Sequence, residues 1–330
     1  MPPGEFELIE RYFRAPAEAL RRERGDVALG IGDDAALLQV PPGMQLVAAV
    51  DTLVEGRHFP TGTSPESLGH RALAVNLSDL AAMGAEPAWF LLSLTMPDVR
   101  ADFLEGLARG LLSLAQEHRI ALVGGDTTAG PLSVSVQVLG LVEPGTALRR
   151  STAKSGDLLF VSGTPGDAAA GLEMEMGIPQ ASQVVAAQQQ YLRRRFLYPT
   201  PRLALGQALR GLASACIDVS DGLAADAGKL AQASGCGARI EVERLPVSAA
   251  LQAQLGSSAL RAALAGGDDY ELCFTVAASR ADEIPARLIN VKCPVTCIGV
   301  LEESAGVRVC KNGVPIGLDL RGYDHFNPPR

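Results

Sequence analysis

The chain has 330 residues, 47% of them hydrophobic and 20% charged, which favours two domains because a single core rarely grows beyond roughly 250–300 residues. The formal net charge of −8, with only four lysines, argues against a nucleic-acid-binding surface, which needs a basic patch. No apolar run is long enough to span a membrane, and the acidic first 14 residues lack the apolar core of a signal peptide. We therefore expect a cytoplasmic protein that contacts neither nucleic acid nor membrane.

The first half of the chain predicts alternating helices and strands. Residues 64–83 have apolar side chains three and four apart, Ser64 and Pro65 suit the start of a helix, and Gly84 suits its end. The other expected elements are a polar-faced helix and connector at 1–24, strands at 44–50, 89–94, 120–123 and 132–142, and a helix at 99–117.

The polar segment at 143–157 is rich in turn residues, and we expect it to link a domain at 1–145 to a domain at 151–330. A second set of alternating elements follows it. We expect strands at 158–161, 213–217 and 271–276, and helices at 167–176, 183–195, 202–212 and 222–233. The alternation predicts the α/β (α+β) class.

Six short carboxylate motifs stand where apolar runs stop. Strand-like runs lead into at least three of them, since Asp and Gly propagate strands poorly and suit turns at strand ends. The six motifs are Gly32-Asp33-Asp34, Asp51-Thr52, Asn76-Leu77-Ser78-Asp79, Gly124-Gly125-Asp126, Asp218-Val219-Ser220-Asp221 and Gly266-Gly267-Asp268-Asp269. Together they indicate one acidic site built from distant segments. Carboxylates at close range need cations, and oxygen ligands suit Mg²⁺ or Ca²⁺ better than zinc.

Each motif also has an ordinary structural interpretation. Asp221 could cap the helix that follows it, and Gly124-Gly125-Asp126 could be a simple turn. His58 could be a surface loop residue. Asp79 has apolar neighbours in its helix, so a partly buried carboxylate there needs a partner, which a metal ion would provide.

Other kinds of site find less support. The six cysteines all follow residue 215, and several lie in apolar runs, so we expect buried thiols. Neither a Ser-His-Asp nor a Cys-His arrangement can be built from the spacing, and the phosphate-loop motif GxxxxGK[ST] is absent. If the protein handles phosphates, metal ions must supply most of the positive charge.

Taken in order, the motifs resemble those of the thiamine-monophosphate kinase family, within the aminoimidazole-ribonucleotide-synthetase-like ATP-binding superfamily. The resemblance covers nearly the whole chain. It rests on Gly30-Ile31-Gly32-Asp33-Asp34, Asp51-Thr52-Leu53-Val54-x-Gly56-x-His58-Phe59, Asn76-Leu77-Ser78-Asp79-Leu80-Ala81-Ala82-Met83-Gly84, Gly124-Gly125-Asp126-Thr127-Thr128, Asp218-x-Ser220-Asp221-Gly222-Leu223, Gly266-Gly267-Asp268-Asp269-Tyr270-Glu271-Leu272 and Gly322-Tyr323-Asp324-His325-Phe326.

The resemblance implies a two-domain fold, with a mixed sheet covered by helices in each domain, and a homodimer joined through the N-terminal domain. It implies ATP-dependent phosphorylation of thiamine monophosphate to thiamine diphosphate. The implied Mg²⁺ ligands are Asp34, Asp51, Asp79, Asp126, Asp218 and Asp221, of which Asp126, Asp218 and Asp221 are the implied catalytic acids. The implied ATP contacts are Gly125, Asp126, Arg150 and Ser220, and the implied substrate contacts are His58, Asp268 and Tyr323.

One position departs from the family pattern, and several relatives are rivals. Ala49 and Val50 stand where the family often has a hydroxyl residue before the Asp of Asp51-Thr52. A selenophosphate synthetase should have a reactive residue near the N-terminus, yet no cysteine precedes Cys216, and a hydrogenase-maturation relative should end in cysteine. An amide-activating ribonucleotide synthetase and a non-catalytic nucleotide or metal sensor remain as alternatives.

Overall fold

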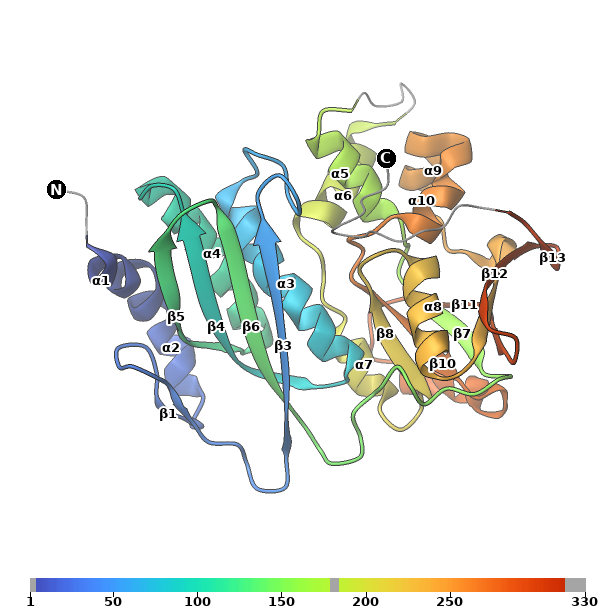
Figure 1. The fold of residues 1–330 in the computed structure, drawn as a ribbon, viewed down its shortest axis with the longest axis horizontal. Helices are drawn as coiled ribbons and strands as arrows, with labels where there is room; N and C mark the ends of the chain where they lie inside the picture. The colour runs from blue at the N-terminus through green and yellow to red at the C-terminus, as the bar shows by residue number, and fades with distance from the viewer. Residues whose placement is uncertain (1–3, 179–183, 318–330) are drawn as a thin grey trace. The chain divides into compact units, whose positions relative to one another are not determined.

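The computed structural model describes residues 4–178 and 184–317. The chain divides into two compact units, one formed by 1–80 and 85–145, and the other by 81–84 and 146–330. Each unit is a mixed sheet with helices packed on it (Figure 1), so the predicted α/β class is confirmed.

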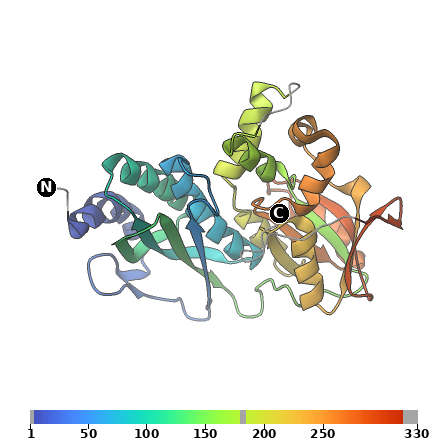
Figure 2. The same cartoon turned by 45° about the horizontal axis from the view of Figure 1, so that its top comes forward.

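The first unit is built on a four-stranded sheet in the order β3-β6-β4-β5, in which only β4 and β5 are parallel. Its strands are β3 (Gln45–Val54), β4 (Glu86–Met96), β5 (Ala121–Ala129) and β6 (Ser133–Val142). The two long helices α3 (Pro65–Ala82) and α4 (Ala101–His118) lie on one face of the sheet (Figure 2). They approach closely because Gly69 and Gly110 have no side chains, and a Cβ on either would lie about 2 Å from a backbone oxygen of the other helix.

The remaining elements of this unit precede the sheet in the chain. They are α1 (Glu5–Leu8), a π-helical turn η1 (Ile9–Arg14), α2 (Ala15–Glu23) and the short antiparallel pair β1 (Val27–Leu29) and β2 (Leu37–Leu38). Trp89, the single tryptophan of the chain, is fully buried in a cluster with Val27. Its indole N–H donates to Asp26 at 3.0 Å, which satisfies the buried polar atom.

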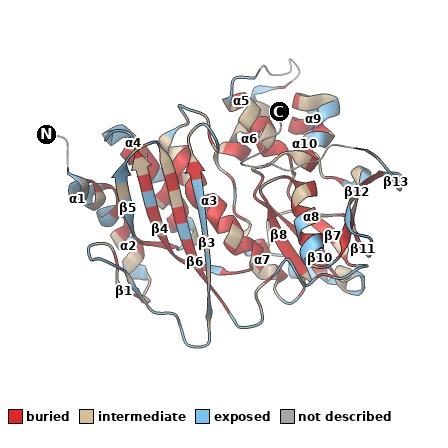
Figure 3. Cartoon of the chain, in the orientation of Figure 1, coloured by how far each residue is buried: buried red, intermediate tan, exposed pale blue. Residues whose placement is uncertain are grey.

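The second unit has a seven-stranded sheet in the order β13-β12-β9-β11-β7-β10-β8, in which only β12 and β9 are parallel. The strands are β7 (Leu158–Ser162), β8 (Ala215–Val219), β9 (Gly237–Glu241), β10 (Glu271–Val276), β11 (Val295–Glu302), β12 (Gly306–Lys311) and β13 (Val314–Pro315). Figure 3 shows β8 and β10 as buried along their length, and Phe160 of β7 stacks on Phe274 of β10 with ring centres 5.3 Å apart.

Helices of the second unit pack in two places. α8 (Leu223–Ala233) contributes to the core of the sheet, whereas α5 (Asp167–Glu175), α6 (Ala186–Leu197), α9 (Ala249–Leu255) and α10 (Ala259–Ala265) pack together near one end of it (Figure 1). The unit also contains α7 (Leu203–Leu209), α11 (Ile284–Arg287) and three short 3-10 helices, η2 (Val242–Arg244), η3 (Gly256–Ser258) and η4 (Ala278–Glu283).

Most elements with a clear apolar period agree with the sequence predictions. The helix expected at 64–83 is α3, which begins after Ser64 and ends at Ala82, two residues before Gly84, where φ is +65°. The predicted alternation in 132–142 is the strand β6, with Val134, Val136 and Val138 buried. Four of the six cysteines are buried, as expected: Cys216, Cys236, Cys273 and Cys310.

The expectation that acids stand at strand ends is wrong at two motifs. Asp51 lies within β3, and Asp126 lies within β5, which continues through Gly124 and Gly125 to Ala129. Asp and Gly have low strand propensity, but pairing with a neighbouring strand stabilises these segments in the sheet. Asp51 is paired with Val136 and Asp126 with Ser93.

Candidate functional site

A cavity of about 1090 Å³ in the first unit brings together three of the predicted site residues. Asp34 comes from the segment between β1 and β2, and Gly125 and Asp126 come from β5. Val50, one of the two residues that depart from the family pattern, is also part of the cavity wall. The wall therefore combines carboxylates with an apolar side chain.

Gly125 is required by the geometry of this wall. Its φ is +154°, and a Cβ would lie 1.8 Å from the carbonyl oxygen of Leu92 on β4. The pairing of β4 with β5 shifts register between Phe90 and Leu91, next to this close approach. Only glycine allows the bulged backbone to lie this close to β4 without a clash.

Asp51 and Asp79 belong to a second group in the same unit. The fully buried Asn76 accepts a hydrogen bond from the Asp51 backbone N–H at 2.8 Å and donates to the Ala72 carbonyl at 2.9 Å. Asn76 thereby joins β3 to α3 at Asp51. Asp79 lies three residues after Asn76 and so on the same side of α3.

His58 follows β3 in a tight turn. The ring Nδ1 of His58 accepts the Val54 backbone N–H at 3.0 Å, and the backbone N–H of His58 donates to the Val54 carbonyl at 2.9 Å. The imidazole therefore stabilises the turn through Nδ1. It is not part of the wall of the 1090 Å³ cavity.

The predicted acids of the second unit lie at the end of β8. Asp218 is buried within the strand, and Ser220, Asp221 and Gly222 lead into α8. The Asp226 carboxylate accepts the backbone N–H groups of Ser220 at 3.0 Å and Asp221 at 2.9 Å. Asp226 thus caps this turn, and the N-cap residue of α8 is Gly222, with no side-chain cap hydrogen bond.

Lys229, which the sequence analysis did not single out, adds a positive charge to this turn. Its Nζ lies 2.7 Å from Asp226 and also contacts the Asp221 carboxylate. Burial raises the pKa of Asp226 above its ordinary value, and Lys229 opposes that effect. The spacing from Asp226 to Lys229, one helical turn, was the signal that could have identified the pair.

Asp268 lies next to this turn. Its backbone N–H donates to the Ser220 carbonyl at 2.8 Å, and the Tyr270 N–H donates to the Val219 carbonyl at 2.8 Å. Gly267 permits the approach, since a Cβ there would lie 2.6 Å from the Ser220 oxygen. The structure therefore brings Asp268, Ser220 and Asp221 together in the second unit.

Arg150 and Tyr323 are the remaining predicted residues. Arg150 is exposed, and its carbonyl accepts the Ser234 hydroxyl at 2.7 Å. Tyr323 lies outside the described residues. Within residues 4–178 and 184–317, no three His, Cys, Asp or Glu side chains are gathered closely enough to hold a metal ion. The predicted acids nevertheless offer carboxylate oxygens alone, a donor chemistry that suits a hard cation.

Known proteins similar to the chain share both of its halves. The family model "AIR synthase related protein, N-terminal domain" matches residues 32–142, and the corresponding C-terminal domain matches residues 154–311. A thiamine-monophosphate kinase from Salmonella typhimurium is 47% identical over 331 aligned residues, which cover 100% of each chain.

Solved structures agree with this similarity. A thiamine-monophosphate kinase from Stenotrophomonas maltophilia K279a is 47% identical with a TM-score of 0.86, covering 95% of this chain and 98% of its own. AaThiL complexed with AMPPCP and TMP is 33% identical with a TM-score of 0.77, covering 98% of this chain and 97% of its own.

Proposed function

Because the chain belongs to the thiamine-monophosphate kinase family of AIR synthase related proteins, we propose that it transfers the terminal phosphoryl group of ATP to thiamine monophosphate, giving thiamine diphosphate and ADP. The observation that carries the proposal is the 47% identity to a thiamine-monophosphate kinase along the whole of both chains. A relative complexed with AMPPCP, an ATP analogue, and TMP supports the same pair of substrates.

The chemistry follows from the charges involved. The acceptor is a phosphate that is already deprotonated near neutral pH, so its oxygen can attack without a strong general base. A direct in-line transfer is then the simplest mechanism, and positioning and charge stabilisation dominate it. We assign Mg²⁺ binding to Asp34, Asp51, Asp79, Asp126, Asp218 and Asp221, because these acids present only oxygen donors. Bound Mg²⁺ would neutralise the phosphates that the acids would otherwise repel.

The remaining assignments concern binding. Gly125, Arg150 and Ser220 are proposed to contact ATP, with Arg150 supplying charge at its phosphates. His58, Asp268 and Tyr323 are proposed to contact thiamine monophosphate. Among these, Ser220 and Asp268 are joined by a backbone hydrogen bond of 2.8 Å, which supports neighbouring roles.

The setting of the reaction is also proposed. We assign the protein to the cytoplasm and expect a homodimer joined through the first unit, with no nucleic-acid partner. No helix within the described residues has the length and apolar character needed to cross a membrane.

The experiment is product analysis. Purified protein is incubated with ATP, Mg²⁺ and thiamine monophosphate, and thiamine diphosphate and ADP are quantified by chromatography. We expect both products in equal amounts and neither without thiamine monophosphate. Saturating substrates that give no thiamine diphosphate would refute the proposal, and ADP released with free phosphate alone would indicate a different acceptor.

A further inference from the structure

The segment around Asp268 has an unusual backbone. Asp268 has φ +68° and Tyr270 has φ +51°, and they are two of the four non-glycine residues with positive φ in the described part of the chain. Residues other than glycine avoid positive φ because their Cβ clashes with the backbone, and bulky residues such as tyrosine avoid it most of all. Surrounding contacts must therefore hold the segment in place.

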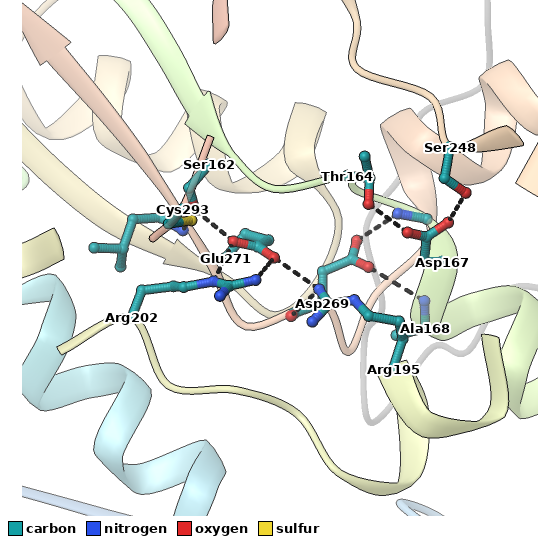
Figure 4. Close-up of polar contacts among 12 residues, drawn as sticks. Ser162, Thr164, Asp167, Ala168, Arg195, Arg202, Ser248, Asp269, Glu271 and Cys293 are labelled. Carbon is teal, nitrogen blue, oxygen red and sulfur yellow. Dashed lines mark hydrogen bonds and ion pairs between the residues drawn. The ribbon is translucent and has the colours of Figure 1, made fainter. Parts of the chain in front are cut away.

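Asp269 supplies the first of these contacts. Its side chain is fully buried, and it accepts the backbone N–H groups of Gly166 at 2.7 Å and Ala168 at 3.4 Å, at the start of α5 (Figure 4). The carboxylate thus ties the segment to a helix more than 90 residues away in sequence. Burial raises the pKa of Asp269 well above its ordinary range.

Glu271 supplies the second contact. It is also fully buried, and it accepts Arg202 Nε at 2.7 Å and Nη2 at 2.5 Å, Arg195 Nη2 at 2.7 Å and the Ser162 hydroxyl at 2.5 Å. Arg195 Nη2 also donates to the Asp269 carbonyl at 3.3 Å. Figure 4 shows the two arginines reaching this acid from different sides, Arg195 from the side of Asp269 and Arg202 from the other.

Asp268 and Tyr270 contact the end of β8 and the turn that follows it. Asp268 and Tyr270 donate their N–H groups to Ser220 and Val219, and the Tyr270 hydroxyl donates to Asp268 Oδ1 at 3.2 Å. The contacts of the buried Asp269 and Glu271 therefore hold Asp268 beside the turn that follows β8.

We propose that Asp269 and Glu271, through α5, Arg195 and Arg202, are positioning residues that hold Asp268 in its left-handed conformation for binding thiamine monophosphate. The inference rests on the proposed function. It predicts that loosening either anchor weakens thiamine monophosphate binding while ATP binding and the chemical step continue.

Asp269→Asn is the main test variant, because it is neutral and nearly isosteric in a buried position. The amide has one acceptor oxygen where the carboxylate has two, so one N–H of α5 loses its partner. We expect the KM for thiamine monophosphate to rise about tenfold, the effect of one lost hydrogen bond, with kcat and the KM for ATP nearly unchanged.

Asp167→Asn is the matched control. Asp167 is equally buried in the same cluster, yet its carboxylate bonds to the hydroxyls of Tyr191 at 2.7 Å and Ser248 at 2.5 Å, and also to Thr164. We expect this variant to lower the melting temperature without changing either KM. A double variant, Asp268→Asn with Asp269→Asn, should bind thiamine monophosphate no worse than Asp268→Asn alone, because Asp269 acts through Asp268.

A second variant covers a failure of Asp269→Asn to fold. Arg202→Lys keeps the charge but loses the two-pronged contact with Glu271, and it should raise the same KM by a smaller factor. The positioning role is wrong if these variants change only the melting temperature or raise both KM values alike. It is also wrong if the double variant binds thiamine monophosphate more weakly than Asp268→Asn alone.

Amide hydrogen exchange tests the positioning role independently of the proposed function. In Asp269→Asn, the N–H groups of Asp268 and Tyr270 should exchange faster than in the wild type, whatever the substrate. A wild-type protein that does not phosphorylate thiamine monophosphate would refute the function, whereas unchanged exchange at these two amides would refute the positioning.

Discussion

At the scale of single residues, one buried acid organises the turn that carries Ser220 and Asp221. Asp226 accepts two backbone N–H groups of that turn and pairs with Lys229, which also contacts Asp221. Two backbone donors and the Lys229 ammonium offset the burial of this carboxylate, and removing it leaves the two N–H groups without that acceptor while Lys229 keeps its contact with Asp221. Asp226 therefore has a structural role in this turn, and the proposed metal-binding role of Asp221 can be tested separately from it.

Substitution can separate these roles. Asp221→Asn and Asp126→Asn should each lower kcat by about 10²–10³-fold, as expected for losing a charge that stabilises the transferring phosphoryl group. Their melting temperatures should stay close to that of the wild type. Asp226→Ala should instead lower the free energy of unfolding by about 1–3 kcal/mol. Steady-state kinetics and thermal melts on the same preparations give the comparison, and near-normal turnover of Asp221→Asn would return that acid to a structural role.

Glu271 predicts a dependence of stability on pH. Burial alone would raise its pKa, but hydrogen bonds and charge from Arg202, with the charge of Arg195, hold the pKa below the ordinary value of 4.5. Because the folded pKa is depressed, the carboxylate stabilises the fold above pH 4.5, and that contribution is lost as the pH falls through the folded pKa. Denaturant titrations from pH 6 to pH 3 should show a shallower loss of stability in Glu271→Gln than in the wild type. Equal slopes would contradict this assignment of the charge.

At the scale of elements, the bulge in β5 turns a strand into part of a cavity wall. A regular strand would alternate its side chains between the two faces of the sheet, whereas the register shift beside Gly124 and Gly125 changes the local twist. The motif is therefore a distorted strand and not the turn that its composition suggests.

Two glycines allow the bulge to be tested. Gly125 and Gly145 both have positive φ, at +154° and +80°, but only Gly125 has backbone atoms where a Cβ would stand. Gly145→Ala should destabilise the protein by about 1 kcal/mol from backbone strain alone. Gly125→Ala should cost about 3 kcal/mol or more, because β4 and β5 must also move apart. Chemical denaturation of both variants measures the difference, and equal losses would mean that the close approach is easily relieved.

The spacing of apolar residues predicted the elements in which those residues repeat at regular intervals. α3, α4, β6, β8, α8 and β10 agree with it, because their apolar positions repeat within the segment itself. The pattern did not identify β9, β11, α9 or α10, which are segments of five to eight residues. Strand pairing stabilises β9 and β11, and a sequence does not display its partners.

At the scale of the whole molecule, the sequence likewise does not show which distant residues contact one another in the candidate site. The acids could be chosen from sequence because Asp and Gly interrupt apolar runs. The anchors of Asp268 could not, since Glu271 meets Arg195 across 76 positions and Asp269 meets Gly166 across 103. Only the presence of Glu271 at the start of the otherwise apolar β10 hinted that a buried charge had partners elsewhere.

The open edge of the first sheet leads to a prediction about assembly. Among the strands that the structure describes, β3 pairs with β6 alone, and most of its residues are exposed (Figure 3), including Leu46 at 48% and Val50 at 61%. Exposed apolar side chains on an edge strand favour association with another chain. We therefore expect a homodimer, with a mass close to twice 34.5 kDa by light scattering at micromolar concentration.

Leu46→Glu places a charge on this edge strand away from the acids and should shift the mass toward the monomer, because burying an unpaired carboxylate in an apolar interface is unfavourable. Val99→Glu is the matched control, since Val99 is 42% exposed in the same unit but lies outside β3. It should leave the dimer intact. A wild-type monomer would contradict the predicted assembly, and a dimer that tolerates Leu46→Glu but not Val99→Glu would place the interface near α4 instead of on β3.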